Sequence, residues 1–266
     1  MKLTTVLSAV NNNPNYYKFI PKQIIFWKKF NINFIAVFVG ISIPDELINY
    51  SSNIILWDKN LDLVPSYVAQ NIRIYYPSLL HLPDDEIVMI TDMDMLPGND
   101  KYYKEGLENF DINDFIYYRY IDQNEEYKQI YMCYNGAHPS LWAKLFKINS
   151  EEDIEKTLFN NYHNNYDYDG IPGCKGWFQD QIIMYNNLHN YDNLKILNRP
   201  LKRLHSPEFI EHLNKGDTLF ISEYDDIHFH RSFFDNESLI LNAEEQLNKI
   251  DILTKLDYDY DYEYEN

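Results

Sequence analysis

Short apolar runs alternate with longer amphipathic stretches over the first hundred residues of the chain. Runs of β-branched and aromatic residues that are bounded by polar or turn-forming ones are typical of strands buried on both faces of a parallel sheet. The strands predicted in this way are Leu3–Val10, Phe34–Val39, Asn53–Leu56 and Ile87–Ile90. Apolar residues at helical spacing predict helices over Pro21–Phe30 and from Val64 to Leu79, the second of them ended or kinked by Pro77. This alternation predicts an α/β fold with right-handed crossovers.

The pattern is less regular in the remainder of the chain. The elements predicted there are strands Phe115–Tyr118 and Ile227–Phe229 and helices Ser150–Phe159, Phe178–Leu188 and Glu237–Leu256. Asn160–Gly173 is polar and rich in Tyr and Asn, which predicts a loop of the kind that closes over a site. The alternation of Tyr and acidic residues from Asp257 onward predicts a disordered tail.

Composition restricts the class of protein. The chain has 266 residues, of which 45% are hydrophobic and 16% aromatic, so a wholly disordered protein is excluded. Its formal net charge of −18 argues against nucleic acid and anionic membrane surfaces as partners. Two cysteines imply no disulfide framework, and no apolar run has the length of a transmembrane helix. Thr and Ser interrupt the apolar start, which favours a first strand over a signal peptide, so we expect a soluble cytoplasmic protein without membrane insertion.

Asp92 and Asp94 follow the predicted strand Ile87–Ile90, with one residue between them. Open α/β sheets bind their ligands at the carboxyl ends of central strands, where these side chains would lie. Left unpaired there, the two carboxylates would repel each other, so a divalent cation is their natural partner, and oxygen ligands suit Mn²⁺ or Mg²⁺. A solvated turn is the alternative, because the chain contains four Asp-x-Asp triplets. Only this triplet follows a buried-strand pattern, which favours the metal site.

Other stretches also carry residue types that bind ligands. They are the strand end Ser8–Asn11 and the segments Cys133–Ala137, Gly176–Gln181 and Ile227–Arg231. The first offers backbone groups at a sheet edge for a base or ribose, and the second a glycine that permits close backbone approach. The third joins the aromatic ring of Trp177 to an acid and an amide that can hydrogen-bond a sugar. In the fourth, His228 and His230 would share one face of a strand, so either could be a third metal ligand.

These motifs together resemble the metal-dependent nucleotide-sugar glycosyltransferases of GT-A fold, from Leu3 to about Ser232. "ITDMDMLP" is similar to their Asp-x-Asp motif, "IRIYYPSLL" to an Arg-bearing helix and "YNGA" to a segment over the donor sugar. "QDQIIMYN" resembles the Asp-Gln segment of glycogenin-like and galactosyltransferase-like retaining enzymes, and "IHFHR" resembles their metal-ligand segment. The order of the motifs is similar to that in uncharacterised glycosyltransferases of large DNA viruses and bacteria.

The resemblance implies a mixed, mainly parallel GT-A sheet flanked by helices, in a single domain over residues 1–256. Residues 1–100 would form the nucleotide-binding half, 101–236 the acceptor and metal half and 237–256 a C-terminal helix, followed by an acidic Tyr-rich tail over 257–266. The implied activity is that of a hexosyltransferase that moves a sugar from a UDP-sugar donor to a glycan or protein-linked hydroxyl, with Mn²⁺ or Mg²⁺ as cofactor. A viral member would act in the host cytoplasm.

Site roles follow from the strand ends and from the matched motif positions. The predicted donor-binding residues are Ala9, Val10, Asn11, Arg73, Asp92, Met93, Asp94, Asn135 and Gly136. Asp92, Asp94 and His228 would hold the metal, and Trp177 would contact the acceptor. Asp180 would act as general base if the reaction inverts, or would steady the cationic sugar with Gln181 if it retains. The Asp-Gln resemblance favours retention slightly.

The family's Lys-Pro-Trp after the metal-ligand histidine is absent here. His230-Arg231-Ser232 stands in its place, so Arg231, Lys202 and Arg203 are the candidates for holding a diphosphate. Structural roles compete with several of the predicted ones: Asp180 could cap its helix, and Arg73 could form only a salt bridge. The remaining histidines have no partner pattern and are expected to be surface or satisfied residues; they are His81, His138, His163, His189, His205 and His212.

Two other functions fit part of the pattern. A strand that ends in Asp-x-Asp is also found in phosphatases of the haloacid-dehalogenase type, with Asp92 as nucleophile and Asp94 as acid and base. That class begins its core with the nucleophile strand, whereas three predicted strands precede the strand Ile87–Ile90 here. The other alternative is a non-catalytic sugar-binding module, in which the acids hold a structural cation.

Overall fold

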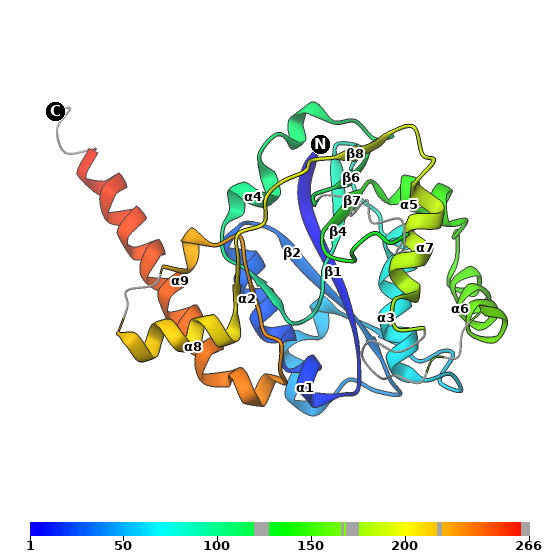
Figure 1. Cartoon of the computed structure of the whole chain (residues 1–266), viewed down its shortest axis with the longest axis horizontal. Helices are drawn as coiled ribbons and strands as arrows, with labels where there is room; N and C mark the ends of the chain where they lie inside the picture. Colours follow the sequence, from blue (N-terminus) through cyan, green and yellow to red (C-terminus); the bar gives the residue numbers. More distant parts are fainter. Residues whose placement is uncertain (120–127, 166–167, 169–175, 217–219, 262–266) are drawn as a thin grey trace.

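The computed structural model describes residues 1–119, 128–165, 168, 176–216 and 220–261. Its centre is a seven-stranded sheet in the order β3-β2-β1-β4-β7-β6-β8, with helices on both sides (Figure 1). The strands are β1 (Lys2–Asn11), β2 (Asn33–Val39), β3 (Ile54–Trp57), β4 (Glu86–Ile90), β6 (Phe115–Tyr117), β7 (Asn135–Ala137) and β8 (Leu194–Ile196). Neighbouring strands are parallel except at β7, which runs against both β4 and β6. The predicted mixed, mainly parallel α/β sheet is therefore confirmed.

Helices cover both faces of the sheet because its central strands are apolar on both. Val6 and Leu7 of β1 are fully buried and belong to separate clusters of core residues, since successive side chains of a strand point to opposite faces. On the first face lie α1 (Pro14–Tyr17), α2 (Ile20–Lys29), α4 (Asp100–Lys104) and α9 (Phe233–Asp261). On the second lie α3 (Pro65–Tyr75), α5 (Pro139–Phe146), α6 (Glu151–Asn165) and α7 (Gln179–Leu188). None of the helices in the described part of the chain is long and apolar enough to cross a membrane.

A second, three-stranded sheet brings the late part of the chain to the end of β4. Its strands are β5 (Met95–Pro97), β10 (Asp226–His228) and β9 (Arg203–His205), in that order. β10 is antiparallel to β5 and parallel to β9. Because β5 begins one residue after Asp94, this pairing carries β10 directly beside the predicted metal site. The sequence analysis predicted a strand near β10 but neither β5 nor β9.

Several predicted boundaries need correction. α6 continues to Asn165, so the first residues of the predicted loop Asn160–Gly173 are helical, and most of its others lie outside the described residues. α9 begins at Phe233 and continues to Asp261, so the chain from Asp257 to Asp261 is helical rather than a disordered tail, and residues 262–266 are not described. The α3 prediction is confirmed: the helix ends at Tyr75, ahead of Pro77, and a 3₁₀ turn follows.

Gly98, which follows β5, is expected to tolerate no side chain. Its N–H donates to the Asp225 carbonyl at 2.9 Å, and a Cβ there would lie 2.8 Å from the carbonyl oxygen of Ile221 and closer still to that of Tyr224. Gly98→Ala should therefore lower the free energy of unfolding by roughly 1–3 kcal/mol, measured by urea titration. Lys101→Ala, on the exposed side of α4, is the control and should change it by less than about 0.5 kcal/mol. Equal effects would contradict the close packing.

Candidate active site

A cleft of about 930 Å³ opens where the carboxyl ends of β1 and β4 meet the second sheet. Its lining comes from the end of β1, one side of α3, the link between β4 and β5, the segment before β7, the start of α7, and β9 and β10. A smaller pocket of about 350 Å³ lies between α6 and α7 and contains none of the predicted site residues. The larger cleft is therefore the candidate active site.

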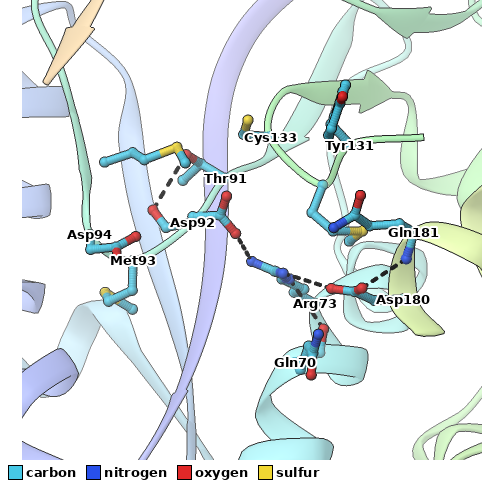
Figure 2. Close-up of polar contacts among 12 residues, drawn as sticks. Gln70, Arg73, Thr91, Asp92, Met93, Asp94, Tyr131, Cys133, Asp180 and Gln181 are labelled. Carbon is cyan, nitrogen blue, oxygen red and sulfur yellow. Dashed lines mark hydrogen bonds and ion pairs between the residues drawn. The ribbon is translucent and has the colours of Figure 1, made fainter. Parts of the chain in front are cut away.

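Most of the predicted site residues line this one cleft, although they come from distant parts of the sequence. They are Ala9, Val10, Asn11, Arg73, Asp92, Met93, Asp94, Trp177, Asp180, Gln181 and His228. Figure 2 shows how the side chains around Asp92 lie relative to one another.

Asn135 and Gly136 are not among the lining residues. Both lie in β7 and are buried behind the cleft wall, where the Asn135 amide donates to the backbone carbonyls of Tyr131 at 2.8 Å and Met132 at 2.9 Å. A Cβ on Gly136 would lie 3.2 Å from Cδ1 of Ile87, so the glycine allows close packing within the sheet. Their placement gives no support to the predicted direct contact with a donor; Asn135 instead holds the backbone of the residues that line the cleft.

Arg73 joins two carboxylates on opposite sides of the cleft. Its guanidinium pairs with Asp92 through Nη1 and with Asp180 through Nη2, the latter at 2.8 Å (Figure 2). α3 starts with Pro65 at its first turn and places Arg73 in its last turn, facing the end of β4. Asp180 lies in the first turn of α7, and its other oxygen accepts a hydrogen bond from the Gln181 N–H at 2.8 Å.

The environment shifts the pKa values of these two acids in opposite directions. Burial alone would raise the pKa of Asp92, but the charge and hydrogen bond of Arg73 outweigh it and the pKa is lowered. For Asp180, which is 1% exposed, burial is the larger effect and raises the pKa despite the pairing with Arg73. Asp92 is therefore the carboxylate that Arg73 keeps ionised most firmly.

Asp94 has a different environment, on the other side of Asp92 from Arg73 (Figure 2). Burial and the charge of Asp92 raise its pKa to about 7. No lysine or arginine in the described ranges pairs with Asp94. Its Oδ2 lies 3.8 Å from Nε2 of His228, which is too long for a hydrogen bond. A carboxylate in this position gains from a cation between it and the imidazole.

His228 also fits a role as metal ligand. Burial and the charge of Arg203 lower its pKa to about 3, so the imidazole is neutral at neutral pH and its nitrogen lone pair is available. Its buried Nδ1 atom has no hydrogen-bond partner among the described residues. Two carboxylates and one imidazole are donors that suit Mn²⁺ or Mg²⁺, so the residues present fit the predicted metal.

The backbone of the Asp92–Asp94 segment is fixed by a residue that was not predicted to belong to the site. Gln23 of α2 is fully buried, and its amide donates to the carbonyls of Met93 at 2.7 Å and Met95 at 2.9 Å. Trp27 Nε1 donates to the side-chain Oε1 of Gln23 at 2.9 Å and so orients the amide. The only sequence signal for this role was a glutamine next to the apolar positions of the predicted helix Pro21–Phe30.

Two further cleft residues come from β9. Arg203 lines the cleft and is held by Asp226, with Nε to Oδ1 at 2.7 Å and Nη2 to Oδ2 at 2.5 Å. Of the three residues suggested to hold a diphosphate, only Arg203 lines the cleft; Lys202 and Arg231 do not. His205, which was expected to be a surface or satisfied residue, is half-buried and lines the cleft beside His228. No sequence pattern pointed to β9, which explains the omission.

Comparisons with known proteins bear on the fold. Neither the protein-family models nor the curated protein sequences contain a match to the chain. Among solved structures, apo GlyE, a glycosyltransferase of Streptococcus pneumoniae TIGR4, is 11% identical over 96% of this chain and 64% of its own, with a TM-score of 0.51. The fold is that of GT-A-type glycosyltransferases.

Other solved structures are similar at lower TM-scores. The galactosyltransferase LgtC, in complex with donor and acceptor sugar analogues, is 13% identical and covers 85% of this chain and 87% of its own, with a TM-score of 0.46. A glycosyltransferase involved in glycosylation of the major capsid of PBCV-1 is 10% identical over 94% of this chain and 100% of its own, at 0.43. At 11% identity, the likeness to GlyE shows the fold and leaves the function to the site.

Removing the charge of Arg73 should destabilise the protein increasingly as the pH rises. Arg73→Gln leaves Asp92 and Asp180 buried without their cation, which should cost about 3–5 kcal/mol of unfolding free energy at pH 8. Both carboxyl pKa values should rise in the variant, so protonation relieves the loss, and the difference from the parent should shrink towards pH 5. Urea titrations at several pH values measure it.

Arg73→Lys is the matched control, because it keeps one positive charge but cannot bridge two carboxylates. It should lie between the parent and Arg73→Gln at pH 8. A loss that is the same at pH 5 and pH 8 would show that packing, rather than charge, is the main contribution of Arg73.

Asp94→Asn should stabilise the metal-free protein at pH 8 and abolish stabilisation by Mn²⁺. A carboxyl whose folded pKa is raised to about 7 stabilises the protein below its unfolded pKa and loses that contribution as the pH rises through 7. At pH 8 in EDTA the variant should therefore be more stable than the parent by roughly 1–2 kcal/mol, a difference that shrinks as the pH falls below 7 and vanishes only below about pH 4, where the unfolded carboxyl is also protonated. Mn²⁺ should raise the melting temperature of the parent only. A variant with an undiminished Mn²⁺ response would refute the assignment.

Proposed function

We propose that this protein is a glycosyltransferase that moves a hexose from a UDP-sugar to a hydroxyl of a glycan or protein-linked acceptor, with Mn²⁺ as cofactor. The observation that carries the proposal is the bridge from Asp92 through Arg73 to Asp180. It connects the end of β4, where a metal and diphosphate would bind, to the start of α7, where the sugar would react, within one cleft. The shared fold of the glycosyltransferase GlyE supports the same class of reaction.

The charges around the cleft suit a nucleoside diphosphate. The protein carries a formal net charge of −18, yet three arginines line this cleft, namely Arg73, Arg119 and Arg203. Asp92, Asp94 and Asp180 line the same cleft, so its charges nearly balance, and a bound divalent cation would supply the net positive charge that an anionic ligand needs. Ala9, Val10 and Asn11, at the carboxyl end of β1, would bind the base and ribose through backbone groups.

Asp92, Asp94 and His228 would hold the metal. Bound there, a divalent ion supplies Lewis-acid stabilisation for the negative charge that develops on the leaving diphosphate. Arg73 keeps the Asp92 carboxylate ionised and oriented. Gln23 holds the backbone between the two acids, so their side chains need little rearrangement when a ligand binds.

Asp180 and Gln181 would act on the sugar. Both oxygens of Asp180 already accept hydrogen bonds, one from Arg73 and the other from the Gln181 N–H. A carboxylate held in this way is better suited to offset positive charge on the reacting sugar than to remove a proton, which favours retention. The buried Oε1 of Gln181 has no partner among the described residues and can accept a hydrogen bond from a sugar hydroxyl. The acceptor proton would then pass to the leaving phosphate.

Trp177 would bind the acceptor. Its ring is half-buried in the cleft wall, and its backbone carbonyl accepts a hydrogen bond from the Gln70 amide. Gly176 precedes it with φ of 92°, a conformation that glycine adopts readily. An indole beside the acid and amide of α7 provides the flat apolar face on which a sugar ring stacks.

The test is hydrolysis or transfer of UDP-sugars in the presence of Mn²⁺, measured as release of UDP. Asp94→Asn should lower the rate about 100-fold or more, because stabilisation of the leaving group is lost. Asp45→Asn, an exposed acid outside the cleft, is the matched control and should leave the rate unchanged. Turnover of p-nitrophenyl phosphate without UDP release would support the phosphatase instead. Binding of sugar without turnover would support a non-catalytic module.

A further inference from the structure

Three histidines gather at the open side of the second sheet. Each of His205, His228 and His230 offers a ring nitrogen, and these atoms all lie within 4.8 Å of one another. The ring centroids of His228 and His230 are 4.0 Å apart, and those of His205 and His230 are 4.5 Å apart. We propose that these three histidines form a second binding site, for Zn²⁺ or a chemically similar cation, which shares His228 with the site proposed for Mn²⁺.

The backbone itself brings the three rings together. His205 and His228 are register partners on the parallel strands β9 and β10, so their side chains point to the same face of the small sheet. His230 lies two residues after His228, and the intervening Phe229 N–H donates to the Asp94 carbonyl at 3.0 Å. The ring of His230 lies against that of His228, with centroids 4.0 Å apart, so both side chains are on the same side of the chain.

The ring nitrogens of the cluster are close enough to share one ion. Nε2 of His230 and Nδ1 of His205 lie 2.5 Å apart and form a hydrogen bond, which a cation bound by both rings would replace. The buried Nδ1 of His228 has no hydrogen-bond partner among the described residues. His205 and His228 are half-buried and His230 is exposed, so an ion can reach the cluster from solvent.

The chemistry of the three ligand atoms determines which metal ion the cluster prefers. Three imidazoles suit Zn²⁺, and three histidine ligands leave its fourth position open to water or another ligand. Nitrogen donors bind Zn²⁺ more strongly than Mn²⁺, whereas carboxylate oxygens suit Mn²⁺. Two adjacent sites with different preferences therefore share His228. Zn²⁺ on the three histidines should weaken Mn²⁺ binding at Asp94; this coupling rests on the proposed function, but the three-histidine site itself does not.

Titration of the metal-free protein with Zn²⁺ alone, followed by calorimetry, tests the site. His205→Gln and His230→Gln should each weaken Zn²⁺ binding about 10- to 100-fold or more, since loss of a ligand costs at least as much as loss of its supporting contacts. Both variants should keep the rise in melting temperature that Mn²⁺ produces. His81→Gln, an exposed histidine outside the cleft, is the matched control and should bind Zn²⁺ like the parent.

Asp94→Asn separates this proposal from the proposed function. It should keep the Zn²⁺ affinity of the parent and lose the response to Mn²⁺. Loss of Zn²⁺ binding in Asp94→Asn would place Zn²⁺ on the carboxylates, and unchanged binding in both histidine variants would overturn the site. If Zn²⁺ binds as expected but no variant affects UDP release, the three-histidine site stands and the proposed function fails. Melting temperatures in EDTA show whether each variant is folded.

Discussion

The salt bridges of Arg73 are the interaction on which the arrangement of the cleft depends. A buried guanidinium touches the carboxylate at the end of β4 and the carboxylate at the start of α7, so one side chain sets the distance between two elements far apart in the sequence. Neither acid has another basic side chain so close among the described residues. Because removal of one partner would leave a buried charge uncompensated, all three residues depend on one another.

The small sheet is the second constraint. β5 leaves the Asp92–Asp94 segment and pairs with β10, and β10 pairs with β9, so the acids and the histidines are connected by backbone hydrogen bonds. Gln23 fixes the same segment from the opposite side through its buried amide. The functional side chains are thus held by strands and a helix rather than by loops alone, which limits the rearrangement needed for a ligand to bind.

The spacing of apolar residues and the positions of turn-forming residues were sufficient to predict the central strands and helices. β1, β2, β4, α2 and α3 lie close to their predicted positions because their apolar patterns are long and bounded by clear polar or proline signals. The errors have local causes. β5 ends in Pro97 and β9 contains a single apolar residue, Leu204, so neither has the apolar run from which β6 was predicted. The ends of α6 and α9 carry polar, Tyr-rich sequence that resembles a loop or tail.

Local patterns of residues were enough to predict the α/β class, the strand that precedes Asp92 and the residue types able to bind a metal and a sugar. Which of these residues lie together was visible only in the tertiary structure. It showed that Arg73 lies between Asp92 and Asp180. It also showed that Asn135 does not line the cleft and that His205 does. The physical reason is that strand pairing and burial act between residues far apart in the chain, and no local pattern encodes those partners.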